Sequence, residues 1–277
     1  MALGVLSGRL LRETSVELIQ TLQANCISKG RDSDDAESRK QSVKSLAKVI
    51  LTLGMDQIAP EVLKSVLDTF YAALKDYQLD RRGDVGSWVR EETMVSLTLF
   101  VETLVVQGKS NPDLLRSVGG DTPAFFERYV GSLLQQLMEK IDRVREVAGR
   151  QLQLFFKSTA SHVCDFAEKD ALCALFSQEY STGDTNMDGG AFETHLHDEG
   201  VAYLPWRSGD FVFEQLLPFF DSQTYSLQIF KGLFMSSGGL TESIFKASSK
   251  TLFKYLSDMK GNTAKKSDFL GKLITIF

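Results

Sequence analysis

Apolar residues recur three and four positions apart along most of this chain, and this spacing constrains its fold more than any other feature. A period of 3.6 residues places such residues on one face of an α-helix, whereas a half-buried strand needs strict alternation. Only 5 of the 277 residues are proline, so few positions interrupt the pattern. The sequence therefore predicts an all-α protein, with helices over residues 8–28, 36–54, 60–77, 86–107, 122–141, 143–158, 163–178, 210–219, 222–237, 241–260 and 266–277.

Residues at the ends of these segments suit helix termini. Thr122 and Thr241 can accept backbone N–H groups through their hydroxyls and so cap the helices that follow them. Pro60 fits the first position of a helix, where its missing N–H group has no partner to lose. Gly54 and Gly108 follow apolar runs and are predicted to end helices in the left-handed conformation that glycine adopts readily.

One short motif occurs three times. In each copy an Arg is followed seven residues later by Leu, and an inter-helix break containing Asp precedes it; the three sets are Asp35–Arg39–Leu46, Asp84–Arg90–Leu97 and Asp142–Arg145–Leu152. Such a unit resembles the helical hairpin of the HEAT repeat, which buries its apolar faces by stacking on neighbouring hairpins. The arginines are 51 and 55 residues apart, which is longer than the usual period. We therefore predict a HEAT/armadillo-like helical-hairpin solenoid with irregular repeats or long loops.

The Asp and Arg of this motif have a structural interpretation. In such a hairpin the Asp accepts hydrogen bonds from backbone N–H groups at the start of the second helix, and the Arg bridges to the next inter-helix turn. Arg39, Arg90, Asp142 and Arg145 are thus predicted to be structural residues of a ladder that follows the turns of the solenoid.

Trp88 lies at the start of one of these second helices, in the stretch "GDVGSWVREETMVSL". The repeat favours packing of its indole against the neighbouring hairpin. The alternative is a direct contact with a partner, made together with Arg82 and Asp84, because tryptophan is enriched in binding hot spots.

A second candidate surface is a stripe of lysines. Lys246, Lys250 and Lys254 recur at every fourth position and so follow one side of a helix, while apolar residues lie largely away from them, at Phe245, Leu252, Phe253 and Leu256. The stripe is either a solvated face or a docking site for an acidic partner.

Composition excludes several classes of function. The formal net charge of −5 gives no overall positive field for nucleic acid. The most apolar stretch, "SLTLFVETLVV", is interrupted by Glu102 and is too short to span a bilayer. Three cysteines without paired short spacing indicate reduced thiols, which are typical of a cytosolic protein.

Residues 179–207 are rich in Gly, Asp and Thr and are predicted to be a flexible inserted loop. The loop contains "DTNMDGGAFETH", which has the first half of a calcium-binding loop but has His195 at the position of the bidentate Glu. His195 and His197 have no third ligand nearby in the sequence. We therefore predict no metal, no cofactor and no catalytic residue.

Three strings are less generic than the helical pattern: "GDVGSWVREETMVSL", "EKIDRVRE" and "YSLQIFKGLFMSSGGLTESIFKASSKTLFKYL". Together they resemble the C-terminal region of the tubulin-folding cofactor D family. The segment "GGLTES", which contains Gly238, Gly239 and Thr241, carries much of the resemblance because helix formation does not dictate it.

The resemblance implies a helical solenoid that binds β-tubulin after its release from the chaperonin. It also implies a role with cofactors C and E and an Arf-like small GTPase in assembling or dismantling the αβ heterodimer, in the cytoplasm and at the microtubule cytoskeleton. A contribution to GTPase activation would belong to the assembled complex. Because members of the family are several times longer, the chain is expected to be a fragment.

The sequence thus predicts a non-catalytic tubulin-folding scaffold in three parts. Residues 1–178 form HEAT-like repeats, residues 179–207 the inserted loop, and residues 208–277 the C-terminal helical hairpins. The alternative within the same fold is a generic HEAT-repeat adaptor of another complex, which has no reason to carry "GGLTES". An enzyme is disfavoured because no catalytic constellation is recognisable.

Overall fold

The computed structural model describes residues 15–30, 35–158, 165–178, 204–238 and 241–277. These residues form an all-α, solenoid-like fold, which confirms the predicted fold class. The helices are α2 (Ser15–Cys26), α3 (Ala36–Leu53), α4 (Pro60–Ala73), α5 (Gly86–Ser110), α6 (Pro112–Val118), α7 (Pro123–Leu137), α8 (Asp142–Lys157), α9 (Lys169–Phe176), α10 (Gly209–Leu216), α11 (Ser226–Ser237), α12 (Glu242–Asp258) and α13 (Thr263–Ile276), with short 3-10 helices η2 (Met55–Gln57) and η4 (Leu217–Asp221).

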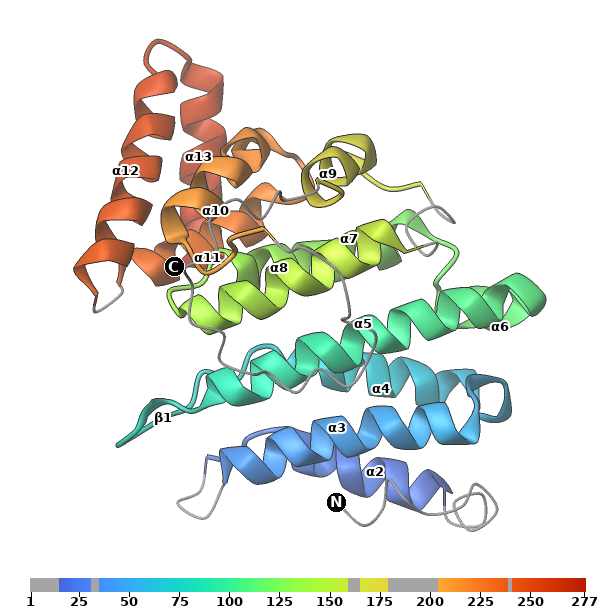
Figure 1. Ribbon diagram of the computed structural model, residues 1–277. Coiled ribbons are helices and arrows are strands. Elements are labelled where there is room, and N and C mark those ends of the chain that lie inside the picture. Colours follow the sequence, from blue (N-terminus) through green and yellow to red (C-terminus); the bar gives the residue numbers. More distant parts are fainter. Residues whose placement is uncertain (1–14, 31–34, 159–164, 179–203, 239–240) are drawn as a thin grey trace.

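The hairpins α2–α3, α4–α5 and α7–α8 stack in sequence order (Figure 1). The second helices of successive hairpins lie side by side, with α3 packed on α5 and α5 packed on α8. The first helices lie on the other side, where α2 contacts α4 and α7 contacts α11. At the far end α12 packs on α10 and α11, and α13 packs on α11. One continuous apolar core runs through this stack from Ile19 to Phe269, as expected where each hairpin buries its apolar face against its neighbours.

The predicted helix termini agree with the structure in part. Gly54 ends α3 with a φ of 85°. Thr122 and Thr241 occupy the residue before α7 and before α12, but neither side chain makes a capping hydrogen bond. The Thr122 hydroxyl instead donates to the Gly119 carbonyl, 2.8 Å away, which leaves the first N–H groups of α7 without this cap.

Gly108 does not end a helix, contrary to the prediction, because α5 continues to Ser110. A Cβ atom at Gly108 would lie only 2.8 Å from Cβ of Leu115 in α6. The glycine is therefore explained by the close approach of α6 rather than by a left-handed turn. The predicted ranges also omit α6, although Pro112 suits the first position of a helix as Pro60 does, and α6 begins there. The sequence pattern did not predict the two-residue strands β1 (Leu79–Asp80) and β2 (Gly83–Asp84).

Residues 179–203, with His195, His197 and the calcium-like motif, lie outside the described residues. The last residues of the predicted loop are described, and Leu204 and Trp206 are buried in the core. In the described part of the chain, no cluster of His, Cys, Asp and Glu side chains could hold a metal ion. Among the same residues, no helix combines the length and the apolar character that a membrane span requires.

Gly232 in α11 permits a close contact with the end of α7. A Cβ atom there would overlap the carbonyl oxygen of Gln135 and crowd Met138. Gly232→Ala is therefore expected to lower the free energy of unfolding by about 1–3 kcal/mol, since backbone atoms must move to admit the methyl group. Urea unfolding followed by circular dichroism measures the loss.

The matched control is Gly271→Ala in α13, where nothing lies within 4 Å of an added Cβ. Because alanine favours a helix over glycine, this variant is expected to gain about 0.5–1 kcal/mol. Equal effects of the two substitutions would contradict the close contact at Gly232.

Candidate functional site

The repeated arginines begin a polar ladder that follows the inter-helix turns. Arg39, Arg90 and Arg145 lie near the starts of α3, α5 and α8, and each is almost fully buried. Arg39 Nε donates to the Asp76 carboxylate at 2.8 Å, and its guanidinium also bonds the Gln78 side chain. The first hairpin is thereby joined to the turn that follows α4.

Arg90 is the centre of the ladder. Its guanidinium donates to both carboxylate oxygens of Asp84 at 3.2 Å and to the carbonyl oxygen of Asp76. It also reaches Gln136 at 3.2 Å and Glu139 at 3.5 Å, and it lies 4.1 Å from the centre of the Tyr77 ring. Arg90 and Glu139 are completely buried, so the Glu139 carboxylate depends on Arg90 for charge compensation, and Arg90 is shared between Asp84 and Glu139.

Arg145 makes the next step of the ladder through carbonyl groups. It donates to the Glu139 carbonyl at 2.7 Å and to the Arg207 carbonyl. Burial lowers the pKa of its guanidinium to about 10, which still leaves it charged at neutral pH. Asp142 accepts from the Arg143 backbone N–H at 2.7 Å and makes no hydrogen bond with Arg145. The ladder thus extends from Arg39 to Arg207 and holds the turns together.

Arg82 and Trp88 meet at the β1–β2 hairpin, whereas Asp84 points to Arg90. The Arg82 guanidinium lies 4.8 Å from the centre of the Trp88 ring and pairs with Asp80 at 2.7 Å. Trp88 is half-buried and packs against the core. Leu79, in β1 of the same hairpin, is 69% exposed, which the sequence pattern did not indicate. This hairpin surface, Leu79–Arg82–Trp88, is the first candidate contact region.

The three lysines of α12 have different surroundings. Lys246 pairs with Glu242 of its own helix, and Lys254 turns toward Glu214 of α10, 3.9 Å away. Lys250 is exposed and makes no ion pair with any described residue. The structure therefore separates Lys254 from the other two lysines of the predicted stripe.

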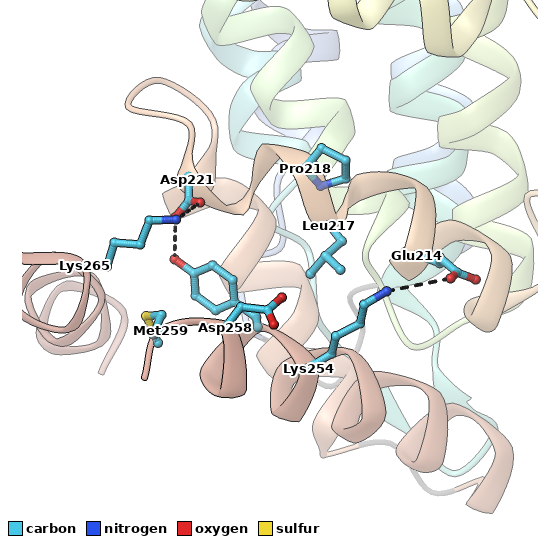
Figure 2. A pocket seen from close by; sticks show the side chains of 9 residues that line it. Glu214, Leu217, Pro218, Asp221, Lys254, Asp258, Met259 and Lys265 are labelled. Atoms are coloured by element: carbon cyan, nitrogen blue, oxygen red, sulfur yellow. Dashed lines mark hydrogen bonds and ion pairs between the residues drawn. The ribbon is translucent and has the colours of Figure 1, made fainter. Parts of the chain in front are cut away.

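Lys254 lines an open groove of about 370 Å³ between α10, η4 and α12. Figure 2 shows Lys254 directed toward Glu214 and Lys265 directed toward Asp221. Tyr255 also donates to Asp221, at 3.1 Å. These charged groups are already paired with one another across the groove. Their ion pairs and hydrogen bonds form a network that joins α10, η4, α12 and the start of α13.

The sequence pattern placed Phe245 and Phe253 with the apolar residues that lie away from the lysines of α12. The structure does not bury these two phenylalanines. They are 50% and 67% exposed, whereas Leu252 and Leu256 are partly buried against the core. Phe245, Ser249 and Phe253 follow the helix at four-residue intervals in a row beside Lys246 and Lys250, whereas other residues of α12 are buried where it packs on α10 and α11. The α12 surface thus combines aromatic and basic groups.

The glycine pair of "GGLTES" separates α11 from α12. Gly238 directly follows α11 with a φ of −88°, so it does not use the left-handed conformation. Gly239 lies outside the described residues, and Thr241 directly precedes α12. These residues belong to the connection between two helices of the C-terminal part.

Cysteine chemistry does not suggest a reactive centre here. Burial raises the pKa of the Cys26 thiol to about 12, which keeps it protonated at neutral pH. Cys173 is half-buried, and burial also raises its pKa. Cys164 lies outside the described residues.

Comparison with known proteins decides the family. The family model described as "Tubulin folding cofactor D C terminal" matches residues 127–277, more than half of the chain. The chain belongs to the tubulin folding cofactor D C-terminal family. The cofactor D match begins in α7 and includes the complete α12 surface, whereas the hairpin surface lies before it.

A curated relative agrees with the cofactor D assignment. The chain is 24% identical to "Tubulin-specific chaperone D" of Dictyostelium discoideum over 199 residues, which cover 67% of this chain. The same match covers 12% of the relative, so the chain spans a small part of that protein's length. No solved structure matches the chain.

Proposed function

We propose that this chain is a non-catalytic scaffold in tubulin folding, which binds β-tubulin during assembly and disassembly of the αβ heterodimer. The observation that carries the proposal is the cofactor D C-terminal match over residues 127–277. The proposed partners are β-tubulin, tubulin cofactors C and E and an Arf-like small GTPase. The proposed location is the cytoplasm, in association with the microtubule cytoskeleton.

The chemistry of the described residues supports a binding role. The buried charged groups of the ladder are engaged with one another and with backbone carbonyls, which suits a structural function. The candidate contact residues Leu79 and Arg82 of the hairpin surface, and Phe245 and Phe253 of α12, are exposed and so accessible to a partner. Any contribution to GTP hydrolysis would come from the assembled complex, in which this chain positions other components.

Capture of tubulin by the purified, immobilised chain tests the proposal. We expect αβ-tubulin to be retained. We expect retention to fall in two double variants: one combines Arg82→Glu and Trp88→Ala, and the other combines Lys246→Glu and Lys250→Glu. The losses from lysine reversal should shrink at high salt, because screening shortens the reach of the charges. Cofactors C and E and the Arf-like GTPase are offered separately in the same assay.

Arg116→Glu is the matched control for charge reversal, because Arg116 is 67% exposed and lies on α6, away from both surfaces. This variant is expected to retain tubulin as the unmodified chain does. A correctly folded chain that captures neither tubulin nor any of the three other components would contradict the proposal and would favour a HEAT-repeat adaptor of another complex.

A further inference from the structure

The α12 surface has an ordered row of exposed aromatic groups. Phe245 and Phe253 are 50% and 67% exposed, and the half-buried Ser249 stands between them at four-residue spacing. At 1.5 Å per residue, the two rings lie about 12 Å apart along the helix axis, with a short side chain midway. Exposed apolar groups that are grouped and bordered by polar residues mark interaction sites.

A row of positive charge runs beside these rings. Lys246 and Lys250 are exposed at the positions that directly follow Phe245 and Ser249. The segment 242–277 contains seven lysines and three acidic residues, whereas the whole chain has a net charge of −5. The C-terminal helices therefore carry a local positive field on an acidic molecule.

We propose that this surface, Phe245–Lys246–Ser249–Lys250–Phe253, docks an acidic amphipathic helix of a partner protein. An apolar side chain of that helix lies over Ser249, between the two phenylalanine rings. Its carboxylates pair with Lys246 and Lys250. The inference goes beyond the proposed function, because it concerns the chemistry of the docked segment and does not require the partner to be tubulin.

Helix packing explains why a helix fits this surface. The four-residue rows of one helix insert into the grooves between the rows of another, and a small residue in a row admits the facing side chain. Ser249 is that small residue, and the rings on either side supply apolar contact area. Lys254 takes no part, because it is turned into the groove toward Glu214 of another helix. Lys246 pairs with Glu242 within α12, but the two side chains are 71% and 79% exposed, so a carboxylate of the partner can exchange with Glu242.

Charge also favours a short acidic segment over an anionic membrane. At physiological ionic strength, charges act over about 8 Å, so a docked helix experiences mainly the nearby lysines. A membrane surface extends over the whole molecule, and the net charge of −5 opposes its approach.

Two synthetic peptides of about 20 residues, long enough for stable helix formation, serve as probes. Both carry the same leucine stripe at helical spacing, and the other positions are rich in glutamate in one peptide and in lysine in the other. Fluorescence anisotropy with the full chain measures their affinities. We expect the glutamate peptide to bind about tenfold more tightly than the lysine peptide, with the difference decreasing at high salt.

Three variants test the separate parts of the surface. Ser249→Trp fills the space between the rings, Phe245→Ser with Phe253→Ser removes them, and Lys246→Glu with Lys250→Glu reverses the charge. Each is expected to weaken binding of the glutamate peptide about tenfold, and the charge-reversed variant is expected to prefer the lysine peptide. The control is Ile274→Ser, which removes an 81% exposed apolar residue from α13.

Circular dichroism verifies that every variant is folded. Any of three results would overturn the docking proposal: the two peptides bind equally, the glutamate peptide does not bind, or Ser249→Trp leaves its binding unchanged. The chain is also sedimented with phosphatidylserine vesicles. If it sediments with them and the double variant Phe245→Ser with Phe253→Ser does not, the docking proposal is overturned in favour of a membrane surface. Failure to capture tubulin and the three other components contradicts only the proposed function, since the peptide assay contains none of them.

Discussion

Trp206→Ala is expected to lower the free energy of unfolding by about 3–5 kcal/mol, as for other large truncations in protein cores. Trp206 is 1% exposed and packs between Phe176 and Phe211, with ring centres 5.3 and 5.6 Å away. Its indole N–H donates to the Gln153 side chain, and its ring covers Gly149, where a Cβ atom would overlap it. Alanine would leave a cavity and would remove one of the two hydrogen bonds that the Gln153 side-chain oxygen accepts, the other coming from the Leu204 backbone N–H at 3.1 Å. Urea unfolding followed by far-UV circular dichroism measures the loss.

Trp88→Ala is the matched control, because the chain contains only these two tryptophans. Trp88 is half-buried, and part of its ring contacts the exposed Arg82. Its truncation is expected to cost clearly less than that of Trp206, since less apolar surface returns to water. The fluorescence of each single-tryptophan variant reports on the remaining residue. Equal losses would contradict the assignment of Trp206 as the central packing residue.

Arg90→Met is expected to lower the free energy of unfolding by about 3–5 kcal/mol. Methionine retains much of the side-chain volume but removes the charge that compensates Asp84 and Glu139. Glu139 is completely buried, and the Asp84 side chain is 7% exposed, so neither carboxylate can recover its hydration without movement of the turns. Urea unfolding of the variant and the unmodified chain gives the difference.

A double substitution distinguishes lost charge compensation from lost packing. Arg90→Met with Glu139→Gln is expected to recover part of the stability, because the neutral amide no longer needs a buried cation. Arg128→Met is the surface control: Arg128 pairs with Asp68 at 3.0 Å, but both side chains are more than half exposed. Exposed pairs contribute about 0–1 kcal/mol. A loss at Arg90 no larger than at Arg128 would show that the ladder does not stabilise the fold.

Helix formation in this chain is readable from the sequence because it depends on neighbouring residues. The spacing of apolar positions predicted α3 and α4. The predicted first residues, Ala36 and Pro60, are the residues at which the two helices begin. The start of α3 follows Asp35, whose carboxylate accepts the backbone N–H of Ser38 at 3.1 Å. Such interactions lie within one helical turn, so the local sequence contains all the participants.

The repeated arginines show where local information ends. Their spacing singled out Arg39, Arg90 and Arg145, but the acceptors of Arg90 include Gln136 and Glu139, 46 and 49 residues away. Stacking of α5 on α8 brings these groups together. The sequence therefore indicated which arginines are structural, whereas the tertiary structure decided which acceptors compensate them.

The sequence by itself determined an all-α chain, its stacked hairpins and its resemblance to cofactor D, because periodicity and short motifs are local properties. Only the tertiary structure decided that Trp206 is buried and that Phe245 and Phe253 are exposed. Burial depends on which helix lies opposite: Gly149 of α8 makes room for the Trp206 ring. On α12, the contacts with α10 and α11 leave Phe245, Lys250 and Phe253 to the solvent, since a helix can bury only one side against its neighbours.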